Sequence, residues 1–124
     1  MTVNEAITNV NNMEPNQYSD TDKLAWLNQL DGQIFDELIL THEHDEDAEF
    51  SKHTATTDTL LVPDPYASEI YENYLKAMIE NENHETMKYN GSMTLFNSAY
   101  QRYAAKINRE RMPLPPFREN RLHF

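Results

Sequence analysis

The pattern of apolar residues near the end of the chain constrains the fold more than any other feature. From Tyr89 onward, large apolar side chains recur at alternating steps of four and three positions: Tyr89, Met93, Phe96, Tyr100, Tyr103 and Ile107. This spacing places them along one side of an α-helix, as a stripe that a second helix must cover. The sequence therefore predicts a long helix from about Thr86 that packs against another helix.

Two helices are predicted in the first third of the chain. Thr2 and Glu5 form a T-x-x-E capping box, which is typical of a helix start. Ser19 or Asp20 is the expected cap of a second helix, whose apolar face continues to about Leu40.

A third helix is predicted directly before the last one. We expect Asp64 as its cap and Pro65 at its first helical position. The turn into the last helix is placed near residues 81–85, with Asn90-Gly91 as the competing break. The predicted fold class is all-α, with about four helices and a long C-terminal helical hairpin.

Residues 41–63 separate the two helical halves. Residues 41–58 have no apolar period and are rich in acidic side chains, so we expect a solvated loop. A short apolar run, residues 59–62, is expected to be extended. We assign residues 1–111 to a single helical domain that contains this acidic loop, and residues 112–124 to an extended C-terminal arm.

Charge is distributed unevenly along this chain of 124 residues and net charge −11. Residues 100–124 hold six basic and two acidic residues, for +4, whereas residues 1–99 hold four basic and nineteen acidic residues, for −15. All five arginines lie in the final 23 residues. Two surfaces are therefore expected, one that repels polyanions and one that binds carboxylates.

The C-terminal arm cannot continue the last helix, because its prolines lack a backbone donor. Prolines also lower the entropy that a free segment loses on binding, so docking onto a partner is favoured. Apolar anchors and arginines complete the set of residues expected to bind a partner: Pro113, Leu114, Pro115, Pro116, Phe117, Arg118, Arg121, Leu122 and Phe124.

The loop contains a T-H-x-H pattern that resembles part of the metal motif of metallo-β-lactamase-fold hydrolases. His42 and His44 match its first pair, but Glu46 and Asp47 stand where the motif has aspartate and histidine. With His53, these side chains are competent zinc ligands, yet ordering a loop opposes binding. We expect no metal.

No catalytic constellation is present in the sequence. The chain has no cysteine, no G-x-S-x-G and no phosphate-binding glycine loop. The carboxylate pairs Asp36-Glu37 and Glu80-Glu82 have no apolar surroundings that would raise a pKa. We expect neither catalytic residues nor a cofactor. No run of about 18 apolar residues occurs, so no membrane contact is expected either.

Two apolar faces are expected on the third helix. Tyr66 with Ile70 marks one face, and Tyr71 with Leu75 marks another. One partner helix covers only one of them. We therefore expect these four residues to contact a neighbouring subunit.

Three segments resemble a known family: "NQYSDTDKLAWLNQLDGQIFDELI", "LLVPDPYASEIYENYLKAMIE" and "YNGSMTLFNSAYQRYAAKINRERMP". They are similar to the small head-tail connector (adaptor) proteins of tailed phages and prophages of Gram-positive bacteria. The resemblance implies a helical virion protein of the neck, made in the host cytoplasm. It implies a ring, commonly of twelve copies, between the portal protein and the tail or a stopper protein, with the C-terminal arm on the portal.

An adaptor ring must also let double-stranded DNA slide through without specific binding. Acidic side chains lining the lumen would repel the phosphates, and the loop supplies five candidates: Glu43, Asp45, Glu46, Asp47 and Glu49. The alternative is a small acidic inhibitor whose carboxylates mimic DNA phosphates on a nucleic-acid enzyme. Size and charge suit this alternative, whereas the arginine-rich arm does not.

Overall fold

The computed structural model describes residues 1–114, and this part of the chain is all-α, as the sequence predicts. A π-helical turn, η1, continues α2 without a break. No strand forms among the described residues, where only two isolated β-bridges occur, Thr2 with Thr59 and His42 with Pro113. The elements are α1 (Val3–Met13), α2 (Asp20–Ile34), η1 (Phe35–Ile39), α3 (Ala67–Glu82) and α4 (Thr86–Glu110).

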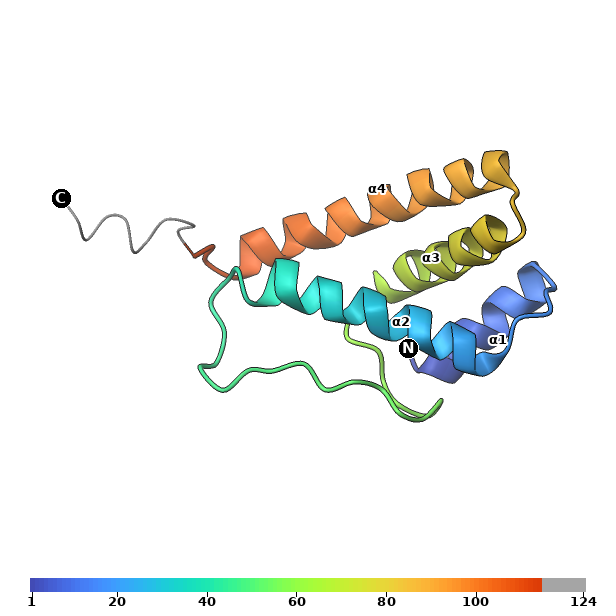
Figure 1. Cartoon of the computed structure of the whole chain (residues 1–124). Helices are drawn as coiled ribbons and strands as arrows, with labels where there is room; N and C mark the ends of the chain where they lie inside the picture. Colours follow the sequence, from blue (N-terminus) through green and yellow to red (C-terminus); the bar gives the residue numbers. More distant parts are fainter. Residues whose placement is uncertain (115–124) are drawn as a thin grey trace.

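The helices form a bundle in which α3 has neighbours on several sides. Figure 1 shows α3 and α4 running side by side in opposite directions, with α1 near the turn that joins them. α2 lies along the other side of α3, and the long loop after η1 returns beneath α2. No helix in residues 1–114 is both long and apolar enough to cross a bilayer.

The first two helices begin as the sequence predicts. The Glu5 N–H donates to the Thr2 hydroxyl at 3.2 Å, and the Thr2 N–H donates to the Glu5 carboxylate at 3.0 Å. The capping box is therefore confirmed. Of the two candidate caps for α2, the structure uses Ser19, whose hydroxyl accepts from the Asp22 N–H at 3.1 Å.

The start predicted for α3 is wrong by two residues. Helix α3 begins at Ala67, with Tyr66 at the cap position and no side-chain cap. The Pro63 carbonyl accepts from the N–H groups of Tyr66 and Ala67, both at 3.2 Å. Residues 63–66 therefore form a turn, and Pro65 belongs to this turn rather than to the helix. The Asp64–Pro65 peptide bond is cis.

The chain reverses between α3 and α4 within residues 83–85. His84 adopts φ 60°, the left-handed conformation that this reversal uses. The competing break at Asn90-Gly91 does not form, since both residues lie inside α4. A Cβ atom at Gly91 would have no neighbour within 4 Å, so packing inside this chain does not require glycine there.

One hydrophobic core joins all four helices and the run after the loop. Its larger members come from α1 (Val3, Ile7, Val10), α2 (Leu27, Leu30, Ile34), residues 60–62 (Leu60, Val62), α3 (Ile70, Tyr71, Leu75, Ile79) and α4 (Phe96, Tyr103, Ile107).

Of the four residues predicted to contact a neighbouring subunit, three belong to this core and Tyr66 packs against it. Ile70, Tyr71 and Leu75 have 0% of their surface exposed. Tyr66 is partly buried, with its ring centroid 5.6 Å from that of Tyr103. The prediction of a free second apolar face on α3 is therefore wrong. Because α3 packs on α1, α2 and α4 of its own chain, it needs apolar residues on more than one face.

Candidate functional site

The acidic loop presents its charges to solvent. All five of the acidic residues singled out in the sequence are exposed: Glu43, Asp45, Glu46, Asp47 and Glu49. Their exposure lets them act on a charged partner at a distance, because none is neutralised by an ion pair among the described residues.

Polar contacts fix the middle of the loop to α2. The Asn28 amide donates to the His53 carbonyl at 2.9 Å and accepts from the His53 N–H at 2.7 Å. Phe50 packs close to Phe35, with ring centroids 6.2 Å apart. The loop is thus held along the bundle rather than attached only at its two ends.

Asp31 connects this attachment to the core. Its side chain is fully buried and accepts three hydrogen bonds, from His53 Nε2 at 2.7 Å, from the Leu61 N–H at 3.0 Å and from the Tyr71 hydroxyl at 2.5 Å. The Tyr71 hydroxyl also accepts from the Val62 N–H at 2.8 Å. Burial, together with the charge of Asp31 and its hydrogen bond, raises the pKa of Tyr71 well above its usual value.

The rings of the three histidines of the loop do not meet at one point, although His44 Nδ1 lies 2.6 Å from the His42 carbonyl oxygen. His42 is buried, with Nδ1 2.8 Å from the Leu38 carbonyl and Nε2 2.6 Å from the side-chain oxygen of Asn108. His44 is exposed, and His53 contacts Asp31. Within residues 1–114, no three His, Cys, Asp or Glu side chains are grouped so that they could hold a metal ion.

The first residues of the predicted arm pair with the start of the acidic loop. The Glu43 N–H donates to the Met112 carbonyl at 3.0 Å, and the Leu114 N–H donates to the Thr41 carbonyl at 2.8 Å. Pro113 and Leu114 therefore lie against their own chain. The other predicted arm residues lie outside the described part of the chain: Pro115, Pro116, Phe117, Arg118, Arg121, Leu122 and Phe124.

Glu80 corrects the expectation that the Glu80-Glu82 pair has no apolar surroundings, because its side chain is buried while that of Glu82 is exposed. Glu80 of α3 is only 3% exposed and accepts from the Ser92 hydroxyl of α4 at 2.6 Å. Glu14, directly after α1, contacts Glu80. Burial, and after it the neighbouring Glu80 carboxyl, raise the pKa of Glu14 to about 7.

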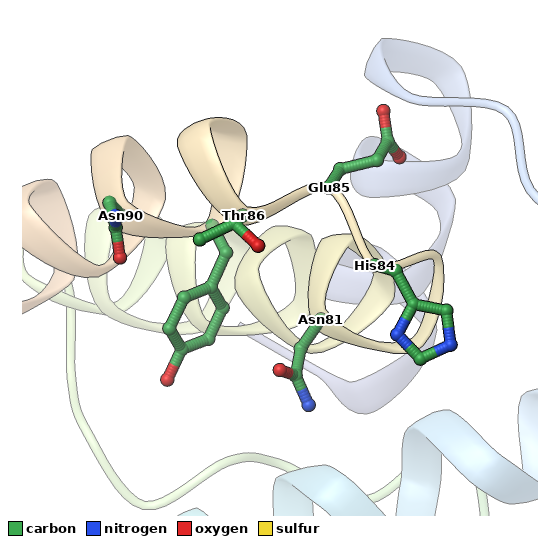
Figure 2. A pocket seen from close by; sticks show the side chains of 6 residues that line it. Asn81, His84, Glu85, Thr86 and Asn90 are labelled. Atoms are coloured by element: carbon green, nitrogen blue, oxygen red, sulfur yellow. The ribbon is translucent and has the colours of Figure 1, made fainter.

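A small open pocket of about 240 Å³ lies at the turn between α3 and α4. Figure 2 shows Asn81 and His84 pointing to one side of the turn and Glu85 to the other. Glu85 already pairs with Lys88 at 3.0 Å. The pocket offers amide and hydroxyl groups for hydrogen bonding. Its lining residues are Asn81, His84, Glu85, Thr86, Tyr89 and Asn90.

Sequence reasoning missed the two buried polar clusters, although one signal was present. Asp31 lies four residues after Leu27 and three before Ile34, so it occupies the apolar face of its helix. An acidic residue in such a position needs a buried partner. The signal marks the residue, but it does not identify Tyr71 or His53 as that partner.

Comparison with known proteins returned no match: no protein-family model, no curated protein and no solved structure is similar to this chain.

Proposed function

We propose that this chain is a head-tail connector subunit of a tailed phage or prophage, forming a ring between the portal and the tail or a stopper protein. The observation that carries the proposal is the resemblance of residues 16–39, 60–80 and 89–113 to that family. These segments contain α2, α3 and α4 almost entirely, together with the run that leads into α3. The resemblance thus covers the framework of the bundle rather than one short motif.

The acidic loop supports a role beside moving DNA. Its five exposed carboxylates are carried on a segment that Asn28 and Asp31 hold against α2. A fixed row of negative charge in a ring lumen repels the phosphate backbone and prevents the counterion release that favours binding. DNA then slides past without being held.

The outer face of α4, the exposed side that carries Met87, Gly91 and Leu95, supports a contact between subunits. It replaces the buried residues of α3 in this role. Residues 89–101 contain no charged side chain, although the whole chain carries −11. Leu95 is 56% exposed and Met87 is 89% exposed. Two copies of an acidic protein approach with least repulsion through such an uncharged face. The open space above Gly91 lets another backbone come close.

The position of Leu114 supports the role of the arm. Because Leu114 pairs with Thr41, the chain continues into residues 115–124 from the base of the acidic loop. Arg111 shares an open pocket there with Glu43 and Asp45. In a ring, every arm would therefore start beside the acidic loop of its own subunit, at a fixed distance from the lumen.

Assembly is the decisive test. The purified chain, alone and mixed with the portal protein of the same phage genome, should form rings visible by electron microscopy and native mass spectrometry. Leu95→Glu should abolish rings by placing a charge in the contact, while Thr8→Glu, on the exposed side of α1, should leave them intact. A chain that stays monomeric or dimeric with the portal, and that inhibits a nucleic-acid enzyme, would favour the DNA-mimic alternative.

The passage of DNA is tested separately. Replacing the five loop acids with lysine should slow DNA ejection from the virion and give the purified ring salt-dependent DNA binding. Replacement by glutamine is the matched control, since it removes the charge without creating attraction. Unchanged ejection by the lysine variant would contradict the role of the loop in the lumen.

A further inference from the structure

An unpartnered oxygen marks the end of α1. The Glu14 N–H donates to the Val10 carbonyl at 2.8 Å and closes the helix. Its side-chain Oε2 is buried, and it is the one buried side-chain nitrogen or oxygen atom in residues 1–114 without a hydrogen-bond partner. A buried acceptor without a donor is destabilising, because it has given up its hydrogen bonds to water without replacing them.

The neighbour of Glu14 cannot supply a donor while both groups are ionised. Glu80 is buried in α3, and an ionised carboxylate only accepts hydrogen bonds. The hydroxyl of Ser92 already donates to Glu80 Oε1 at 2.6 Å. One proton held between the two carboxyl groups satisfies Glu14 and removes one of the two like charges.

Basic side chains near the pair do not replace this proton. Lys76 of α3 and Lys88 of α4 act on Glu14 through their charge and lower its pKa, but less than burial and Glu80 raise it. Lys88 pairs with Glu85 at 3.0 Å. From α2, the Lys23 ammonium donates to the Asn11 side chain at 2.9 Å and to the Tyr18 carbonyl at 2.8 Å.

We propose that Glu14 and Glu80 share a proton that fastens the end of α1 to the α3–α4 pair, and that loss of this proton loosens this end of the bundle. The inference does not depend on the connector function. With the proton bound, the three helices meet through Glu14, Glu80 and Ser92. Without it, two neighbouring carboxylates repel each other, one of them buried, and the end of α1 separates from α3.

The sign of the pH dependence follows from the pKa of Glu14, which is about 7 in the folded chain against an ordinary 4.5. Between these values the folded chain binds the proton and the unfolded chain has lost it. Stability is therefore full below about pH 4.5 for this group and falls as pH rises through about 7. The unfolding constant should rise by up to about tenfold per pH unit in this interval.

Glu14→Gln in the full chain tests the proposal, because glutamine keeps the shape, donates its own N–H to Glu80 and does not titrate. The variant should lose the fall in urea midpoint between about pH 5 and pH 8, and should exceed the parent in stability at the alkaline end. The control is Glu82→Gln, at an exposed position of α3, the helix that carries Glu80. This variant should keep the parent profile. Parallel profiles for Glu14→Gln and the parent would overturn the proposal.

Two local measurements separate a shared proton from a general change in stability. The side-chain carboxyl carbon of Glu14 should titrate by NMR near pH 7. The Glu14 amide should exchange with solvent faster above that pH than its intrinsic rate predicts. Titration of Glu14 near its ordinary pKa of 4.5 would overturn the proposal even if the variant were destabilised.

Discussion

Asp31 and His53 are 22 residues apart in sequence, and His53 Nε2 lies 2.7 Å from Asp31 Oδ2. Because an ionised carboxylate only accepts hydrogen bonds, Nε2 carries the hydrogen of this bond and acts as its donor. The Asn28 side chain holds the backbone of the same histidine through two hydrogen bonds. The acidic loop therefore has a fixed point on α2 at His53.

Asp31→Asn should destabilise the chain by about 2–3 kcal/mol. Asparagine keeps one acceptor oxygen, but its amide nitrogen then faces a donor, either the Tyr71 hydroxyl or the N–H groups of Leu61 and His53. Urea denaturation at neutral pH measures the loss. Asp36→Asn, an exposed position on η1, is the matched control and should change stability by less than about 0.5 kcal/mol. Equal stabilities of the two variants would contradict the network.

His53→Ala should release the loop without unfolding the bundle. It removes one side-chain hydrogen bond to Asp31 and an edge contact with Phe50, whose ring centroid is 6.0 Å away. Loss of about 1.4 kcal/mol corresponds to about tenfold more local opening. Limited proteolysis within residues 41–58 should accelerate by that factor. Ser51→Ala alters an exposed side chain of the same loop and should leave the cleavage rate unchanged; equal acceleration in both variants would mean that His53 holds nothing in place.

Alkaline titration should distinguish four tyrosines with a raised pKa from the other tyrosines of the chain. Burial raises the pKa of Tyr71, Tyr74, Tyr100 and Tyr103, and Glu37 adds to the effect at Tyr100. Their folded-state pKa values lie above the unfolded value of about 10, so the stability they contribute is full below about pH 10 and is lost above it. Phenolate absorbance of these four should therefore appear only with unfolding. Tyr71→Phe should remove one phenolate from the late phase, and an immediate phase containing all seven tyrosines would contradict the prediction.

Local patterns in the sequence were sufficient to predict most helices. The Thr2–Glu5 capping box lies within four residues, and the buried stripe of Phe96, Tyr103 and Ile107 follows from the helical period alone. Such signals involve residues that are close together in the chain, so they can be recognised from the sequence alone.

Contacts between distant residues were not predictable in the same way. Asp31 requires Tyr71 and His53, and Glu80 requires Glu14 and Ser92, so each partner is known only once the helices are packed. The error at α3 has the same origin. A helix with apolar residues on two faces either lies at the centre of its own bundle or contacts a second subunit. The spacing of apolar residues along the sequence is the same in both cases.

Gly91→Ala separates the stability of the chain from its assembly. Glycine inside a helix is less favourable than alanine by about 1 kcal/mol, and a Cβ at Gly91 meets nothing within 4 Å, so the isolated chain should gain about that amount in urea denaturation. If the α4 outer face contacts another copy closely, the same methyl group should weaken the ring.

Gly32→Ala is the matched control for this substitution. Its Cβ would lie 3.7 Å from the Phe50 ring, an ordinary contact far from the α4 outer face, so stability should rise while assembly stays unchanged. Native mass spectrometry of both variants at equal concentration gives the comparison. Rings that form equally well with Gly91→Ala would show that no partner approaches α4 at this position, whereas a destabilised isolated chain would show that Gly91 serves its own fold.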